Sequence, residues 1–193
     1  MTRIIAGTAK GRRLKVPDTG TRPTADRVRE SLFNILEHRY DGLDGVSVAD
    51  LYAGSGALGL EAASRGAAPV VLVENDRAAA AVIASNIETA HLPAHVSAMD
   101  VKVWVSGPAA AHAPYDIVFL DPPYTVSPDT VMSLVASMAQ ADLLADECDV
   151  LYECAKPRKD QQACLWPAGF KEHQVRAYGD TQVRHGVWYG QVH

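Results

Sequence analysis

Short apolar runs alternate with helical stretches along most of this chain, and the alternation predicts a parallel β-sheet covered by helices on both faces. Five runs have the length and apolar character of buried strands: residues 46–52, 69–74, 94–99, 115–120 and 149–153. Helical stretches lie between them, at residues 57–65, 77–90 and 127–140. Parallel strands connected in this way require right-handed crossovers.

An amphipathic helix precedes the first predicted strand, and a hairpin follows the last. The helix has one apolar stripe, formed by Val28, Leu32, Ile35 and Leu36. Thr24 is a typical N-cap, and Asp41-Gly42 form a typical helix end. Residues 172–178 and 183–192 are joined across Gly179-Asp180, which predicts an antiparallel hairpin at one sheet edge. The predicted fold class is therefore α/β: a Rossmann-like, doubly wound, mostly parallel sheet with a C-terminal antiparallel hairpin.

The composition is that of an ordinary globular protein. With 193 residues, 48% of them hydrophobic and 21% charged, the chain can bury one substantial core. No apolar run approaches the roughly 18 residues of a membrane-spanning helix, and the first fifteen residues lack the apolar stretch of a signal peptide. Three widely spaced cysteines do not make a disulfide framework. We expect a monomeric cytoplasmic protein with reduced thiols and no membrane partner.

Positive charge is concentrated near the N-terminus. Residues 1–29 hold eight basic and two acidic residues, a net charge of +6, whereas the other 164 residues carry a net charge of −11. This asymmetry predicts a basic arm that faces a polyanion, although a solvated terminus has the same pattern. We divide the chain into a short N-terminal extension, residues 1–23, and a main domain, residues 24–193. The candidate cations are Arg3, Lys10, Arg12, Arg13, Lys15, Arg22, Arg27 and Arg29.

A glycine-rich turn follows the first predicted strand and opens the next helix, as a nucleotide-binding turn does. Gly54 and Gly56 allow the backbone to turn tightly and to approach a ligand closely. Glu74 ends the second strand, where a carboxylate can accept hydrogen bonds from both hydroxyls of a ribose. These residues predict a site for an adenine nucleoside at the first switch point. Its other candidate members are Tyr52, Ala53, Ser55 and Asn75.

Asp50 indicates which nucleoside binds. It lies at the end of the first strand, where a carboxylate repels a pyrophosphate but attracts an ammonium. S-adenosylmethionine carries an ammonium at its amino-acid end, so this cofactor fits better than a dinucleotide. Asp100 follows the third strand and precedes Val101, and two roles are open for it. Its side chain can accept a hydrogen bond from the adenine amino group, or it can serve as an ordinary helix N-cap.

The most specific motif is Asp121-Pro122-Pro123-Tyr124, directly after the fourth strand. The prolines fix the backbone and lack N–H donors, so that carbonyl oxygens remain as acceptors. A carboxylate, a carbonyl and an aromatic ring together suit a planar group that bears an NH₂. Asp121 and the Pro122 carbonyl would hold the two amino hydrogens and direct the nitrogen lone pair outward, while Tyr124 stacks on the ring. We assign catalysis to these four residues.

These motifs resemble class I S-adenosylmethionine-dependent methyltransferases that act on exocyclic amino nitrogens. The N-terminal segments resemble the RsmD family more narrowly, in Arg3-Ile-Ile-Ala-Gly7, Gly11-Arg-Arg-Leu14, Arg22-Pro-Thr-Ala-Asp-Arg-Val-Arg-Glu30 and Leu32-Phe-Asn34. The resemblance covers nearly the whole chain and is weakest over residues 156–169. It implies methylation of N2 of one guanine in 16S ribosomal RNA, on small-subunit assembly particles, with the N-terminal cations binding the RNA.

Three other functions share part of this pattern. They are a DNA methyltransferase acting on an adenine or cytosine amino group, a nucleotide-dependent oxidoreductase, and a non-catalytic RNA-binding assembly factor. Methylation at carbon 5 of cytosine needs a thiolate near the base, and no cysteine lies beside residues 121–124. Cys148 and Cys154 flank or end a predicted interior strand, where we expect them to pack in the core. The histidines show no metal-ligand spacing, so we assign no metal.

Overall fold

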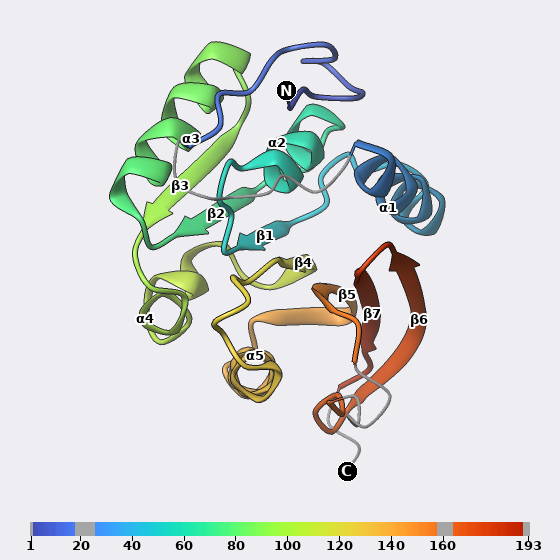
Figure 1. The fold of residues 1–193 in the computed structure, drawn as a ribbon. Helices are drawn as coiled ribbons and strands as arrows, with labels where there is room; N and C mark the ends of the chain where they lie inside the picture. Colours follow the sequence, from blue (N-terminus) through green and yellow to red (C-terminus); the bar gives the residue numbers. More distant parts are fainter. Residues whose placement is uncertain (1, 18–25, 158–163, 191–193) are drawn as a thin grey trace.

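A seven-stranded sheet forms the centre of the protein (Figure 1). The structure, a computed structural model, describes residues 2–17, 26–157 and 164–190. The strands are β1 (Val48–Leu51), β2 (Val70–Glu74), β3 (Ala94–Ala98), β4 (Tyr115–Leu120), β5 (Leu144–Ala155), β6 (Phe170–Tyr178) and β7 (Thr181–Trp188). Their order in the sheet is β3-β2-β1-β4-β5-β7-β6, and only β7 pairs antiparallel with its neighbours β5 and β6. The predicted fold class is confirmed.

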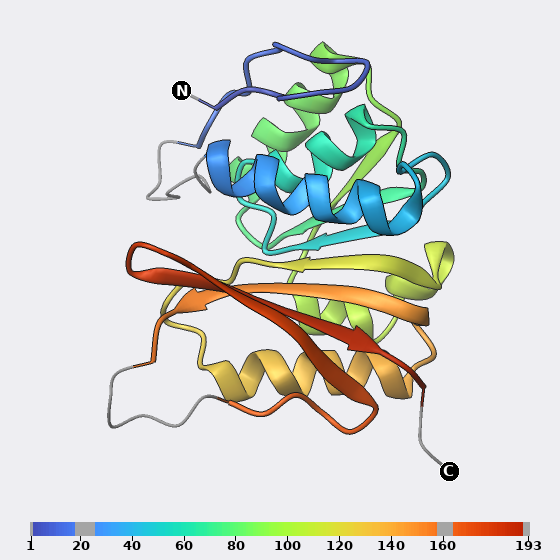
Figure 2. The same cartoon turned by 90° about the vertical axis from the view of Figure 1, so that its right-hand side faces the viewer.

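Helices cover both faces of the sheet. They are α1 (Asp26–Tyr40), α2 (Ala57–Ser64), α3 (Arg77–Ala90), α4 (Val101–Val105), the 3-10 helix η1 (Pro108–His112) and α5 (Pro128–Gln140). Helices α1, α2 and α3 lie on one face, and α4 and α5 lie on the other (Figures 1 and 2). No helix in the described ranges is long and apolar enough to cross a membrane.

The predicted elements agree with the structure except at some ends. The helix at 77–90 and the strand at 115–120 have the predicted bounds. Helix α1 ends where expected, because Asp41 and Gly42 take left-handed φ angles of 54° and 103°. The cap predicted at Thr24 falls outside the described residues. The strand end predicted at residue 192 is wrong, because β7 ends at Trp188 and the next two residues, which the structure describes, are not in a strand. Strand β5 begins five residues earlier than predicted, at Leu144.

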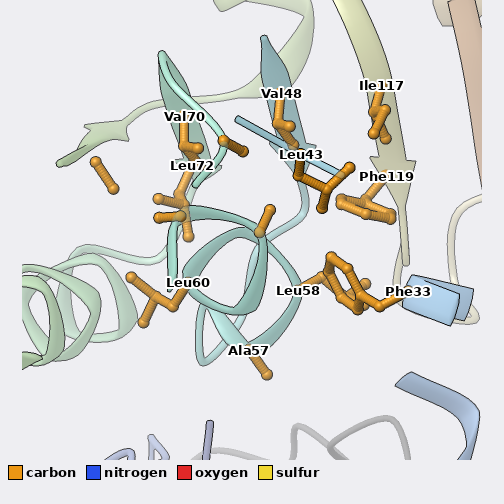
Figure 3. Close-up of a cluster of buried hydrophobic side chains, with 14 of the residues drawn as sticks. Phe33, Leu43, Val48, Ala57, Leu58, Leu60, Val70, Leu72, Ile117 and Phe119 are labelled. Atoms are coloured by element: carbon orange, nitrogen blue, oxygen red, sulfur yellow. The ribbon is translucent and has the colours of Figure 1, made fainter. Parts of the chain in front are cut away.

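Two apolar clusters, one on each face of the sheet, form the core. On the α1 face, the rings of Phe33 and Phe119 lie 5.7 Å apart, and Leu58 of α2 packs beside them (Figure 3). The hydroxyl of Tyr40 donates to the Asp116 carbonyl at 2.8 Å, at the beginning of β4. Helix α1 therefore runs antiparallel to β4, and its N-terminus is directed toward the carboxyl ends of the parallel strands.

The basic N-terminal segment is folded against the domain. The segment formed by residues 2–17, called the arm below, closes on itself, because the Ile4 N–H donates to the Arg12 carbonyl and the Gly11 N–H donates to the Ile4 carbonyl, both at 2.9 Å. It buries three apolar side chains in the core: Ile4, Ala9 and Leu14. The arm lies over α2 and α3 (Figure 2). The alternative of a solvated terminus is therefore wrong for these residues.

Candidate cofactor and substrate site

The carboxyl ends of β1 and β4 lie side by side, because Leu51 pairs with Leu120. From β1 the chain crosses to β2 on one side, whereas β4 lies on the other side, so the sheet has its switch point here. Ligands of open α/β sheets bind outside the strand ends at this point. The glycine turn after β1 and the loop at residues 121–124 after β4 therefore leave the sheet next to each other.

The glycine turn has the tight backbone that the sequence predicted. Gly54 and Gly56 have φ angles of 56° and 77°, in the left-handed region that favours glycine. The Gly56 N–H donates to the Ala53 carbonyl at 2.7 Å, which closes the turn. A third glycine allows close packing, since a Cβ at Gly59 would lie 2.8 Å from the Leu72 side chain. Helix α2 can thus lie directly on β2, with its N-terminus at the switch point.

Asp50 lies under the turn. Its side chain is 1% exposed, and its Oδ2 accepts the Gly59 N–H at 2.8 Å. Gly56 occupies the N-cap position of α2 and has no side chain, so the Asp50 carboxylate serves as the cap from the neighbouring strand. Burial raises the pKa of Asp50 to about 7, against the hydrogen bond from Gly59, and nearby Glu74 adds to the rise. Its contact with an ammonium stays a prediction.

Glu74 bonds to the glycine turn, a contact that the sequence did not predict. Its Oε2 accepts the Gly54 N–H at 2.8 Å, and its Oε1 accepts the Asp76 N–H at 2.8 Å. Each carboxylate oxygen has a further lone pair, so both can still accept hydrogen bonds from ribose hydroxyls. Asn75, between Glu74 and Asp76, is exposed. The structure therefore joins the predicted ribose carboxylate to the predicted turn.

Asp100 and Tyr52 are two further residues that the sequence predicts to bind the cofactor. Asp100 Oδ1 accepts the Lys102 N–H at 2.8 Å, so its role as an N-cap, here of α4, is confirmed. Tyr52 has a left-handed φ of 62°, which is rare for a residue with a large side chain. Burial and the nearby Asp100 carboxylate raise the pKa of Tyr52. Val101 is buried in the core, so only its backbone can contact a ligand.

The loop at residues 121–124 presents an aromatic ring to solvent. Tyr124 is 76% exposed, whereas Asp121 and Pro122 are half-buried. The Val126 N–H donates to the Pro123 carbonyl at 2.9 Å and closes the loop into helix α5. Because this bond engages the Pro123 carbonyl, the Pro122 carbonyl remains the candidate acceptor for the amino group of a base. The loop thus places a half-buried carboxylate beside an exposed ring, and its contact with a base stays a prediction.

Two of the three thiols, those of Cys148 and Cys154, do not suit nucleophilic chemistry. Cys148 is fully buried, and burial raises the pKa of its thiol well above the usual value. Cys154 is half-buried, and burial raises its pKa as well. Protonated thiols are poor nucleophiles. Core packing is confirmed for Cys148, whereas Cys154 is partly buried and packs against the core. Within the described ranges, no group of three His, Cys, Asp or Glu residues could hold a metal ion.

Most of the candidate cations lie on the surface. Six are exposed: Arg3, Lys10, Arg12, Arg13, Lys15 and Arg27. Arg22 lies outside the described residues. The prediction for Arg29 is wrong, because its side chain is 0% exposed. Its Nη2 donates to the Arg3 carbonyl and to Asp26 Oδ1, both at 2.7 Å, so Arg29 attaches helix α1 to the arm.

The residues that hold the arm were not among the candidates drawn from the sequence. Glu61 is buried in α2, where its carboxylate accepts the N–H groups of Ile5 and Ala6 at 2.7 and 2.9 Å. The arm backbone touches α2 so closely that a Cβ at Gly7 would lie 1.7 Å from the Ser64 carbonyl oxygen. Glu61 could have been found, because it is the one acid in an otherwise apolar and small helix.

Solved structures with this topology define the class. An RNA methyltransferase of Salinibacter ruber, solved with S-adenosyl-L-homocysteine, has a TM-score of 0.63 over 89% of this chain and 97% of its own, at 15% identity. A hypothetical protein of Thermus thermophilus matches over the whole of both chains, with a TM-score of 0.79 and 30% identity. The fold is that of the class I methyltransferases.

The chain belongs to the family described as Conserved hypothetical protein 95, whose model matches residues 2–187. Ribosomal RNA small subunit methyltransferase D of Escherichia coli K12 is 46% identical over 123 residues, which are 63% of this chain and 60% of that protein. The predicted membership in the RsmD family is thus confirmed. The chain spans about 60 to 67% of the length of the curated relatives that it matches.

Proposed function

We propose that this protein transfers a methyl group from S-adenosylmethionine to the N2 amino group of a guanine in 16S ribosomal RNA. The observation that carries this proposal is the meeting of the glycine turn and the 121–124 loop at one switch point. A cofactor site and an amine-binding loop are thereby adjacent. The names of the relatives, which are ribosomal RNA methyltransferases, support the choice of RNA over DNA.

The residues of the turn fit this cofactor. Glu74 holds the ribose hydroxyls, and the ammonium of the amino-acid end favours the charged form of the Asp50 carboxyl, whose pKa burial otherwise raises to about 7. Asp100 keeps one carboxylate oxygen for the adenine amino group while the other caps α4. The remaining cofactor contacts come from the backbone of residues 52–56. When bound, S-adenosylmethionine supplies a methyl group on an electrophilic sulfonium.

The 121–124 loop holds the guanine. Asp121 accepts one amino hydrogen and the Pro122 carbonyl accepts the other, which turns the nitrogen lone pair out of conjugation and toward the methyl carbon. Tyr124 stacks on the base, which its exposure permits. The Asp121 carboxylate takes the proton that the amine loses when the new nitrogen–carbon bond forms.

The arm binds the RNA backbone in this proposal. We assign residues 1–23 to RNA binding and residues 24–193 to methyl transfer, in a monomer that acts in the cytoplasm on small-subunit assembly particles. Because the rest of the chain is acidic, the exposed cations of the arm must supply most of the attraction to phosphate. Phosphate contacts position a protein on nucleic acid but carry little sequence information.

Product analysis tests the proposal. The protein is incubated with labelled S-adenosylmethionine and, separately, genomic DNA, naked ribosomal RNA and undermethylated small subunits, and the modified nucleoside is identified. N2-methylguanosine from RNA is expected. A methylated adenine or cytosine in DNA would favour the alternative methyltransferase, and 5-methylcytosine as the sole product would contradict amino methylation altogether.

Asp121 gives a sharper test of the chemistry. If Asp121 acts on the amine alone, Asp121→Ala should abolish most turnover and leave the affinity for S-adenosylmethionine nearly unchanged. Calorimetry measures the affinity, and single-turnover methylation measures the rate. Loss of cofactor binding in this variant would show that the loop shapes the cofactor site instead.

The arm is tested by salt dependence. Replacing Arg12, Arg13 and Lys15 with alanine should weaken binding to small subunits and lower the log–log salt slope by roughly one unit for each cation that binds a phosphate. Cofactor binding should survive, because the arm is held to α3 through the backbone of Lys15. Unchanged affinity and salt slope would mean that these cations do not touch RNA.

A further inference from the structure

One buried amide contacts both the arm and the glycine turn. Asn86 lies on α3 and is 3% exposed. Its Oδ1 accepts the Lys15 N–H at 2.9 Å, and its Nδ2 donates to the Lys15 carbonyl at 3.0 Å. The same Nδ2 donates to the carbonyl of Ser55, in the glycine turn, at 3.4 Å. The end of the arm and the turn are thus bridged by a single side chain.

These three bonds constrain one another. The amide is planar, so the pair of bonds to the Lys15 backbone fixes the direction of its second N–H, which points to Ser55. If Lys15 moved relative to α3, the Asn86 amide would rotate and its bond to the Ser55 carbonyl would break. Because the site is buried, water cannot replace the broken bond cheaply. The position of the arm therefore influences the backbone of the turn.

We propose that Asn86 is a positioning residue that couples the arm to the cofactor turn, so that RNA and S-adenosylmethionine each strengthen the binding of the other. The inference rests on the proposed function, because it takes RNA as the ligand of the arm and S-adenosylmethionine as the ligand of the turn. RNA held by the arm keeps Lys15 on Asn86, and Asn86 keeps the turn in its ordered shape. By linkage, the effect of each ligand on the other is equal.

The neighbouring residue provides a matched control. Ser85 also lies on α3 and also binds Lys15, but through the exposed Nζ of the lysine at 3.1 Å. Ser85→Ala removes this contact between the arm and α3 and leaves the buried amide in place. Asn86→Asp keeps the acceptor for the Lys15 N–H but sets a carboxylate oxygen against the carbonyls of Lys15 and Ser55.

The experiment measures the affinity for labelled S-adenosylhomocysteine by equilibrium dialysis, with and without saturating undermethylated small subunits. In the wild-type protein the subunits should raise the affinity at least about fivefold. The ratio of the affinity with subunits to the affinity without them should fall to near one in Asn86→Asp. It should stay at the wild-type value in Ser85→Ala. Thermal unfolding verifies that each variant is folded, and Asn86→Ala takes the place of Asn86→Asp if the latter does not fold.

The outcomes separate the inference from the proposed function. A wild-type ratio in folded Asn86 variants, with reduced thermal stability alone, would make Asn86 merely structural and overturn the inference. A ratio of one in the wild-type protein, with both ligands bound, would overturn it as well while leaving the proposed function intact. If the wild-type protein failed to bind S-adenosylhomocysteine or failed to bind the small subunits, the proposed function would be refuted, and the inference with it.

Discussion

Replacing Asp50 by asparagine should remove a pH dependence of stability that the buried carboxylate imposes. The Asp50 side chain is 1% exposed, and burial raises its pKa from 3.8 to about 7. In the unfolded chain the carboxyl loses its proton near pH 4. Between about pH 4 and pH 7, the folded protein therefore holds a proton that the unfolded chain has released. Stability falls as the pH rises through this window and is constant above it.

The size of the effect follows from the two pKa values. One pKa unit corresponds to about 1.4 kcal/mol, so a shift of roughly three units costs on the order of 4 kcal/mol at pH 8. Part of this cost has already accumulated at pH 5. Between pH 5 and pH 8 the remaining loss is about 2 to 3 kcal/mol. Asparagine carries no charge at any of these pH values, and its amide oxygen can still accept the Gly59 N–H.

Urea denaturation at several pH values between 5 and 8 measures the difference in unfolding free energy between Asp50→Asn and the wild-type protein. The difference, variant minus wild type, should rise by about 2 to 3 kcal/mol across the range. Titrations elsewhere in the chain cancel in this difference. Asp146→Asn, which removes an exposed carboxylate from β5, is the matched control and should give a nearly constant difference. A constant difference for Asp50→Asn as well would refute the buried, destabilised carboxylate.

Two further substitutions test the turn and the arm. Glu74→Ala should weaken S-adenosylmethionine binding by about 2 to 3 kcal/mol, because charged hydrogen bonds to the ribose are removed; unchanged affinity in calorimetry would remove Glu74 from the site. Gly7→Ala should lower the unfolding free energy by about 1 to 3 kcal/mol more than Gly11→Ala, since both have a φ near 80° but only the new Cβ at Gly7 would strike α2. Equal losses in urea would mean that the arm lifts from α2 without cost.

The bounds of a helix or strand could be predicted where its apolar residues follow a regular spacing and are also the residues that become buried. Helix α3 has an Asp76 cap whose side chain accepts the Ala79 N–H, and a continuous buried stripe, so its bounds could be predicted. The first half of β5 could not be predicted. Residues 145–147 lack apolar alternation, and the register with β4 shifts there around Tyr115, so the polar residues belong to an irregular part of the strand.

The site was predictable as a set of residues but not in its internal bonds. The glycine spacing and the position of Glu74 depend only on the βαβ connection, which the sequence displays. The hydrogen bond from the Gly59 N–H to the Asp50 carboxylate depends on how closely α2 packs on the sheet. Arg29 was misassigned for a similar reason, because charge alone does not distinguish an exposed cation from one buried against the arm. Hydrogen bonds across 26 to 71 residues hold the arm, and no local pattern encodes them.

The attachment of the arm has a consequence for how the protein is made. The arm leaves the ribosome before its anchors, because Ala6 binds a carboxylate 55 residues later and Lys15 binds an amide 71 residues later. At about 5 to 20 residues per second, the basic segment therefore waits on the order of ten seconds before it can dock. During this interval its cations and its unburied Ile4 and Leu14 are open to any partner, including the translating ribosome's own RNA. Once α3 has formed, Ile4 and Leu14 can become buried, and the cations remain on the surface.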